Sequence, residues 1–287
     1  MGESDFIAAL KALASDPAAR GLDDDAAVLE LGSETLVLTH DVLVEGVHVR
    51  TDEDAADVAW KLVAVNLSDL AAKGAQPIGV LLGHMLGEGD ARFIKGLREV
   101  LEAHDVPLLG GDTVRGSGPR SWGCTAIGRA THTPVPDRRN ARAGDGVFVT
   151  GTLGRAMLGF EAADRDSDHA LAYRRPSPLI AEGIALAPHV SAMMDVSDGL
   201  LLDCFRMAQA SDISIDLDSS RFPVADSDMR DECVRWGDDY ELLFTLPPET
   251  PLPVPATLIG KVGGDDLAPL WVDGEMIFPK DGIGYQH

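Results

Sequence analysis

The sequence predicts a mixed α/β protein of the α+β type, built from two domains. Its 287 residues are enough for two domains of ordinary size or for one large α/β unit. Short apolar runs typical of strands alternate with longer stretches of helical periodicity. Residues 131–137, with Pro134 and Pro136, have the composition of a linker. We therefore expect an N-terminal domain over 1–133 and a C-terminal domain over 138–287.

The composition limits the partners of this protein. Its 24 Lys and Arg against 47 Asp and Glu give a net charge of −23, which repels a nucleic-acid backbone. No uninterrupted apolar run reaches membrane length and no leader pattern opens the chain, so we expect a cytoplasmic protein. Its three cysteines lack metal-ligand spacing and are expected to be buried, reduced side chains. Such an acidic protein would need metal ions to handle anions.

The chain opens with a short amphipathic helix over residues 6–13. Three aspartates at 23–25 then lead directly into an apolar, strand-like run over 26–29. Adjacent like charges usually belong to a solvated loop, and we expect this of at least one of the three. Asp25 is the one next to the strand.

A second strand, over 36–39, is expected to end at His40 and Asp41, and residues 42–48 continue in an extended conformation. His48 lies near the end of this stretch. A lone histidine is more often structural than functional, but this one closely follows an acidic strand end.

Residues 58–74 form the helix on which the prediction of function depends. Val58, Leu62 and Val65 recur at helical spacing, and Asp69 takes the next place on the same apolar stripe. Burial and the nearby helix C-terminus, marked by Gly74, both disfavour an ionised Asp69 unless a cation compensates. A metal ion would supply that charge. The alternative is a capped helix end, in which Asp69 bonds Asn66, Ser68 or a backbone amide.

A strand over 78–84 and a helix over 90–104 follow, and then a short apolar run at 107–109. This run leads into Gly110-Gly111-Asp112-Thr113. Paired glycines let a backbone approach a ligand closely, and the aspartate can hold a metal; a simple tight turn is the alternative. Residues 122–127 complete the first domain as another strand.

In the second half, a strand over 147–150, a helix starting near Arg155 and a helix over 179–187 precede an acidic strand end. Residues 192–194 form a short strand that ends in Asp195-Val196-Ser197-Asp198-Gly199, before a helix over 200–210. Ser197 or Asp198 can cap this helix, but one cap does not explain both aspartates. A second carboxylate at a strand end suits a metal bound to a polyphosphate.

The last third repeats the pattern of acidic residues next to a strand. Asp238, Asp239 and Glu241 precede a strand over 242–245. A further strand over 258–262 and a hairpin over 271–278, turning at Asp273-Gly274, complete the domain.

Taken together, these motifs resemble the thiamine-monophosphate kinase family, part of the ATP-binding superfamily that includes aminoimidazole ribonucleotide synthetase. The resemblance covers nearly the whole chain and rests on the order and spacing of Asp24-Asp25-Ala26-Ala27, Asp41, Glu45-Gly46-Val47-His48, Val65-Asn66-Leu67-Ser68-Asp69-Leu70-Ala71-Ala72, Gly110-Gly111-Asp112-Thr113, Val149-Thr150-Gly151, Asp195-Val196-Ser197-Asp198-Gly199-Leu200 and Asp239-Tyr240-Glu241-Leu242.

The resemblance implies transfer of the ATP γ-phosphate to thiamine monophosphate, with several Mg²⁺ ions, by a two-domain protein whose N-terminal domain pairs in a homodimer. It implies that catalysis depends on Asp69, Asp112 and Arg138, with Asp69 as the central metal ligand. The implied ATP contacts are Gly111, Asp112, Arg138 and Ser197, and the implied substrate contacts are His48, Asp238 and Gly282. The implied metal ligands, with His40 beside them, are Asp25, Thr39, His40, Asp41, Asp69, Asp112, Asp195 and Asp198.

Two substrate positions depart from the family pattern. Asp238 shortens a usual glutamate, and Gly282 stands where an aromatic side chain is usual, so Phe278 or Tyr285 is expected to supply the ring. The alternatives to the kinase are a sibling ATP-dependent synthetase on the same scaffold and a non-catalytic nucleotide- or metal-binding homologue. Selenophosphate synthesis is disfavoured because no cysteine precedes Cys124.

Overall fold

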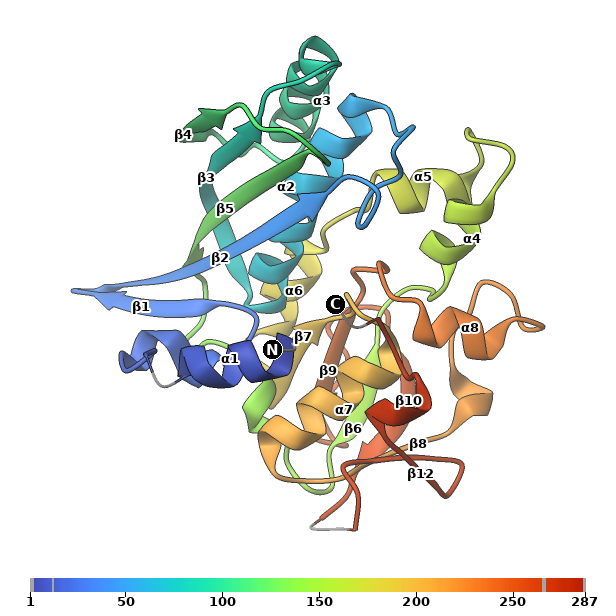
Figure 1. The fold of residues 1–287 in the computed structure, drawn as a ribbon. Helices are drawn as coiled ribbons and strands as arrows, with labels where there is room; N and C mark the ends of the chain where they lie inside the picture. Colours follow the sequence, from blue (N-terminus) through green and yellow to red (C-terminus); the bar gives the residue numbers. More distant parts are fainter. Residues whose placement is uncertain (1–2, 12, 265–266, 286–287) are drawn as a thin grey trace.

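The computed structural model of the chain describes residues 3–11, 13–264 and 267–285. It contains two mixed β-sheets, one in each half of the chain, with helices packed on them (Figure 1).

The N-terminal half is a five-stranded sheet in the order β1-β2-β5-β3-β4, preceded by helix α1 and a 3₁₀ helix, η1. Only β3 and β4 pair in parallel; the other neighbours are antiparallel. Helices α2 and α3 lie against one face of this sheet (Figure 1). The elements are α1 (Glu3–Lys11), η1 (Pro17–Leu22), β1 (Ala27–Leu31), β2 (Glu34–Val44), α2 (Ala55–Ala72), β3 (Ala75–Met85), α3 (Asp90–Ala103), β4 (Leu108–Val114) and β5 (Ser121–Ala130).

The C-terminal half is a seven-stranded sheet in the order β12-β11-β8-β10-β6-β9-β7. Its apolar core includes most of α7 (Leu200–Ser211). The other elements are η2 (Arg138–Asn140), β6 (Gly146–Val149), α4 (Arg155–Glu161), α5 (Asp168–Arg174), α6 (Ile180–Leu186), β7 (Ala192–Asp195), β8 (Ile215–Leu217), η3 (Ser219–Arg221), α8 (Arg230–Arg235), β9 (Leu242–Leu246), β10 (Thr257–Val262), β11 (Leu270–Val272), β12 (Glu275–Ile277) and η4 (Pro279–Asp281).

Helix α2 connects the two halves. Asp54 caps its start by accepting a hydrogen bond from Ala56 N at 2.9 Å, and Gly74 follows its end with φ +57°. Its last turn packs with α6 of the C-terminal half, where a Cβ atom on Gly183 would lie 1.9 Å from Ala71 O. Only a glycine allows two helices to approach this closely.

Most predicted elements are confirmed, including the hairpin of β11 and β12. One strand boundary and one alternative were wrong. The second strand does not end at His40 but continues as β2 through Val44, because its pairing with β5 is unbroken to that point. The Gly110–Thr113 stretch is not a tight turn: it lies within β4, parallel to β3. Three short elements, α5, β8 and α8, were not predicted.

All three cysteines are buried and free, as predicted. Within the described residues, the helices are too short or too polar for a membrane span.

Candidate active site

Asp69 projects from α2 into a group of carboxyl groups. The stripe that predicted its position is buried, with Val58, Leu62 and Val65 each at most 5% exposed. The Thr39 hydroxyl on β2 donates a hydrogen bond to Asp69, and the Asp41 carboxyl is near enough for its charge to act on Asp69. The capping alternative is not observed, since Asn66 bonds Leu62 O and Asp41 N while Ser68 bonds Asp195.

Three carboxylates from distant parts of the chain meet at this point. Asp25 precedes β1, Asp69 lies on α2, and Asp195 ends β7. One oxygen atom of each lies within 4.8 Å of the others. The Ser68 hydroxyl donates to Asp195 at 2.5 Å, which fixes the strand end from the C-terminal half against the helix of the N-terminal half. The sequence prediction that these three aspartates share a site agrees with this geometry.

The electrostatics of the cluster favour a bound cation. Burial raises the pKa of Asp69 well above its usual range, and the charges of Asp41 and Asp195 raise it further. Burial likewise raises the pKa of Asp195, and it raises the pKa of Asp41 to about 6. Closely spaced carboxylates with only oxygen donors match the preferences of Mg²⁺ and similar hard cations. These residues therefore fit a divalent metal site.

The loop after β7 is held by a buried aspartate that the sequence analysis missed. Asp203 on α7 accepts hydrogen bonds from the backbone N of both Ser197 and Asp198, each at 3.1 Å. Arg206 pairs with Asp198 and with Asp203. The N-cap of α7 is Gly199, so neither Ser197 nor Asp198 caps this helix. Both instead line the cavity described next.

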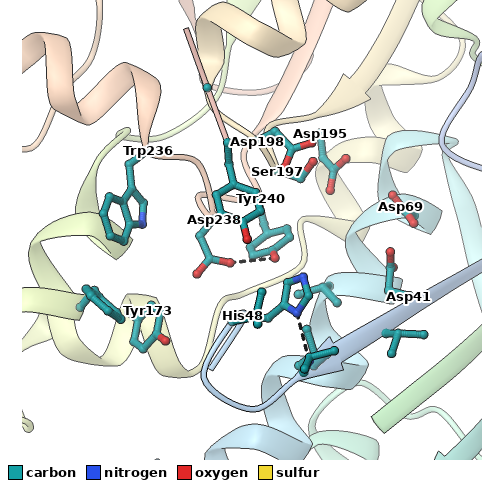
Figure 2. Close-up of a pocket in the computed structure, with 18 of the residues that line it drawn as sticks. Asp41, His48, Asp69, Tyr173, Asp195, Ser197, Asp198, Trp236, Asp238 and Tyr240 are labelled. Atoms are coloured by element: carbon teal, nitrogen blue, oxygen red, sulfur yellow. Dashed lines mark hydrogen bonds between the residues drawn. The ribbon is translucent and has the colours of Figure 1, made fainter. Parts of the chain in front are cut away.

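A cavity of about 750 Å³ opens beside the carboxylates. Figure 2 shows Asp41, Asp69, Asp195 and Asp198 on one side of it and the rings of Trp236 and Tyr173 on the other. Phe160 and Tyr285 also line the cavity, and His40 lies on its β2 wall, with Nδ1 2.8 Å from Thr125 Oγ1. The arrangement suits a ligand that is anionic at one end and flat at the other.

His48 and Asp238, the predicted substrate contacts, both line this cavity. His48 Nδ1 accepts a hydrogen bond from Val44 N at 3.0 Å. Asp238 has a positive φ of 63°, accepts a hydrogen bond from the Tyr240 hydroxyl at 2.8 Å and pairs with Lys61. Lys61, 2% exposed, also lies 4.0 Å from the centre of the Tyr173 ring.

Gly282 and Phe278 are not among the residues that line the cavity, whereas Gly284 and Tyr285 are. Gly282 ends η4 with φ +67°, and its carbonyl accepts a hydrogen bond from Arg235. Of the two aromatic side chains expected to replace the missing ring, Tyr285 is therefore the one in position.

Two predicted residues lie away from the cluster within one chain. Gly111 on β4 and Asp41 on β2 occupy one row of the sheet with two strands between them, which places them about 14 Å apart at the usual strand spacing. Asp112 is exposed on this edge strand, and its carboxylate accepts a hydrogen bond from Thr113 N at 2.9 Å. Arg138, in contrast, pairs directly with Asp25.

The N- and C-terminal domain models of the AIR synthase related protein family match residues 23–130 and 142–266. Thiamine-monophosphate kinase of Escherichia coli strain K12 is 36% identical, with 93% of this chain and 91% of that protein covered. The chain belongs to the thiamine-monophosphate kinase family. This confirms the resemblance drawn from the motifs and, with it, the enzyme class and the two-domain α/β fold.

Other members of the thiamine-monophosphate kinase family match over the full chain. The Haemophilus influenzae enzyme is 33% identical and covers 100% of this chain and 98% of its own length. A solved structure described as AaThiL complexed with AMPPCP and TMP is 30% identical, has a TM-score of 0.88, and covers 100% of this chain and 97% of that one.

Sequence analysis of this family member missed two buried lysines, Lys61 on α2 and Lys73 at the C-cap of this helix. Lys61, Val65, Asp69 and Lys73 are spaced four residues apart, so they share one face of the helix. A lysine inside an apolar helical run was the available signal. Such a lysine is usually placed on the surface because its charge is costly to bury.

Proposed function

We propose that this chain transfers the γ-phosphoryl group of ATP to thiamine monophosphate, giving thiamine diphosphate and ADP, with Mg²⁺ held by the carboxylate cluster. AMPPCP is an ATP analogue, so the complex named for the structural neighbour contains a nucleotide and TMP, the abbreviation of the proposed acceptor. The observation that carries the proposal is the cavity with carboxylates at one end and aromatic rings at the other.

Mg²⁺ is proposed to be held by Asp25, Asp69 and Asp195 at the centre, with Thr39, Asp41 and Asp198 around them. The side chain of His40, between Thr39 and Asp41 on β2, lies on the other face of the strand, where it bonds Thr125. We take Asp69 as the central ligand, because it bonds Thr39, is affected by the charge of Asp41 and lies within 4.8 Å of Asp25 and Asp195. When bound, magnesium would neutralise and align the phosphate oxygens of both substrates.

The chain itself supplies position and charge. The attacking phosphate oxygen of the acceptor is ionised at neutral pH, so no side chain has to act as a strong base. Arg138 pairs with Asp25 and Ser197 lines the cavity, which supports the proposal that both contact the nucleotide. The thiazolium ring of thiamine is a cation, which suits the rings of Tyr173 and Trp236 and the carboxylate of Asp238.

Gly111 and Asp112 take part in this proposal through a homodimer. The face of the N-terminal sheet opposite α2 and α3 carries exposed Val42 and Leu81, at 45% and 38%, and exposed Leu108 and Val114 lie on β4. Apolar side chains on an uncovered sheet suit contact with a second copy. A partner's edge strand could then approach the site from outside.

The cytoplasmic location and the domain limits of 1–133 and 138–287 stay predictions.

Product analysis tests the proposed function. Purified protein with ATP and MgCl₂ should release ADP only when thiamine monophosphate is added, and the thiamine product should be the diphosphate. ADP release without the acceptor, or none with it, would contradict the kinase proposal. Magnesium-dependent ATP binding without turnover would instead support a non-catalytic homologue.

A further inference from the structure

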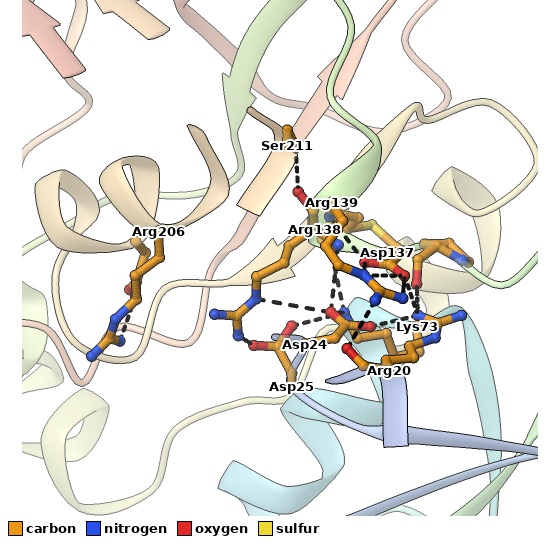
Figure 3. Close-up of polar contacts among 12 residues, drawn as sticks. Arg20, Asp24, Asp25, Lys73, Asp137, Arg138, Arg139, Arg206 and Ser211 are labelled. Atoms are coloured by element: carbon orange, nitrogen blue, oxygen red, sulfur yellow. Dashed lines mark hydrogen bonds and ion pairs between the residues drawn. The ribbon is translucent and has the colours of Figure 1, made fainter. Parts of the chain in front are cut away.

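Lys73 is a fully buried ammonium group next to the carboxylate cluster. Its side chain is 0% exposed. Nζ lies 2.6 Å from Asp24 Oδ1, 2.7 Å from Asp25 Oδ2 and 3.2 Å from Met193 O (Figure 3). Because a lysine is almost never fully buried without partners, these contacts are its compensation.

Lys73 lies next to the backbone segments that carry Asp25, Asp69 and Asp195. Lys73 follows Asp69 by one helical turn, touches Asp25 directly, and bonds the β7 backbone two residues before Asp195. One ammonium group therefore joins the end of α2, the segment before β1 and strand β7 of the C-terminal half.

Each carboxylate oxygen of Asp25 pairs with a different cationic side chain. Arg138, 15% exposed, pairs with Oδ1, whereas Lys73 bonds Oδ2. A long, partly exposed arginine can move to another anion, but the buried lysine has no second position open to solvent. Although burial opposes ionisation of Asp24, Lys73 and Arg20 hold the pKa of Asp24 below its usual value. The charge of Lys73 is thus shared by two carboxylates.

We propose that Lys73 is a fixed counter-ion of the metal site: it holds Asp24 and Asp25 in place without metal, and it weakens Mg²⁺ binding by repelling the ion. Lys73 is a positioning residue, because it acts through Asp25. The inference rests on the proposed function only in taking Asp25, Asp69 and Asp195 as magnesium ligands.

The test is the Lys73→Met variant, studied with MgCl₂ alone and no nucleotide. Without metal, the variant should unfold about 5–10 °C below the wild type, because two buried carboxylates each lose one of the cations that they pair with. Magnesium should then raise the unfolding midpoint more in the variant than in the wild type. In titration calorimetry, the Mg²⁺ dissociation constant should fall by about tenfold, since the like charge is gone.

Lys61→Met is the matched control. Lys61 is also buried on α2 and also pairs with an aspartate, but its partner is Asp238 rather than a member of the cluster. This variant should lose stability without metal yet keep the wild-type Mg²⁺ dissociation constant. A general loss of helix packing would change both variants alike, so the control separates charge at the metal site from structural damage.

An unchanged or weaker Mg²⁺ affinity in Lys73→Met would overturn the proposal, as would the absence of any Mg²⁺ effect in the wild type. If Lys73→Met does not fold, the Asp24→Asn/Lys73→Met double variant removes one charge of each sign and should again bind Mg²⁺ more tightly than the Asp24→Asn single variant. Turnover of thiamine monophosphate by the wild type is measured separately. If the wild type shows no turnover, the proposed function is refuted, but the comparison of Mg²⁺ binding between the variants is unaffected.

Discussion

At the scale of single residues, the carboxylate of Asp69 is surrounded by other carboxylates. It faces Asp41 and shares a 4.8 Å cluster with Asp25 and Asp195. In the metal-free protein these charges repel one another. The same arrangement gives a divalent cation several oxygen ligands at once. The charge of Asp69 therefore lowers the stability of the metal-free protein but is needed to bind the metal.

Asp69→Asn should affect turnover and metal-free stability in different directions. We expect turnover to fall by about 100-fold or more, because a central ligand loses its charge. The unfolding midpoint without metal should stay the same or rise, since repulsion with Asp41 and Asp195 is removed. Steady-state kinetics and thermal unfolding check the two effects. Near-normal turnover would refute the role of Asp69 as the central ligand.

Asp41 should make stability depend on pH. Burial raises its pKa to about 6, and the charge of Asp198 contributes to the rise. Asp41 therefore contributes stability that is fully present below its unfolded pKa of about 3.8 and is lost as pH rises through about 6 in the metal-free protein. Mg²⁺ binds the ionised form, so stabilisation by Mg²⁺ should be small near pH 5 and large near pH 8.

Thermal unfolding between about pH 5 and pH 8, with and without MgCl₂, measures this dependence. Asp41→Asn should flatten the metal-free profile around pH 6. A profile that keeps its slope in the variant would show that another group carries the titration.

The sequence predicted Asp69 because apolar residues at helical spacing fixed its face of the helix. It did not predict Lys61 or Lys73, although they share that face, because burial of lysine depends on partners from other parts of the chain. Asp238, Asp24 and Asp25 supply those partners only after folding. The same holds for Asp203, because the groups that donate to its carboxylate are backbone N–H groups, which no sequence motif marks.

At the scale of elements, the contact between α2 and α6 sets how the two halves meet. Gly183 lies directly against the Ala71 carbonyl, two residues beyond Asp69, and Ala71 belongs to an apolar cluster with Leu186 and Met193. Met193 is on β7, the strand that ends at Asp195. A displacement at this contact would therefore change the distance between carboxylates of the two halves.

Gly183→Ala should force such a displacement. Its new Cβ atom would lie 1.9 Å from Ala71 O, so we expect a loss of about 1–3 kcal/mol in unfolding free energy and weaker Mg²⁺ binding. Chemical denaturation and calorimetry measure the two quantities. Gly264→Ala is the control, because nothing lies within 4 Å of its added Cβ. Equal behaviour of the two variants would contradict the role given to this contact.

The longer elements followed from the sequence because their periodicity covers several turns or alternations. The short elements α5, α8 and β8 did not, since three to seven residues carry too little periodicity to distinguish them from loops. The Gly110–Thr113 stretch also misled, because glycine favours turns in isolation whereas here pairing with β3 holds it in a strand.

At the scale of the whole molecule, the proposed dimer can be tested through the uncovered face of the N-terminal sheet. The wild type should elute at about twice 30.4 kDa, and Leu81→Glu should elute as a monomer, because a charge replaces an exposed apolar side chain on that face. Leu252→Glu, 41% exposed in the C-terminal half, is the control. A monomeric wild type, or a dimeric Leu81→Glu variant, would contradict this arrangement.

The two-domain organisation was accessible from the sequence because the proline-containing segment at 131–137 separates two sets of strands. The resemblance to the family implied that Asp25, Asp69 and Asp195 share a site. The order of the strands alone does not give this, since it does not say which strand ends face each other. Helix α2 decides this by packing against both halves.

Trp236, 38% exposed, allows the cavity to be studied by tryptophan fluorescence. The protein has four tryptophans, and Trp236 is the one that lines the cavity; Trp122 is buried against Phe93, and the indole N–H groups of Trp60 and Trp271 donate to backbone carbonyls. An electron-poor ring stacked on Trp236 would quench its fluorescence. Under the proposed function, we expect binding of the acceptor to lower the Trp236 fluorescence without any added label, and Trp236→Phe to remove this signal.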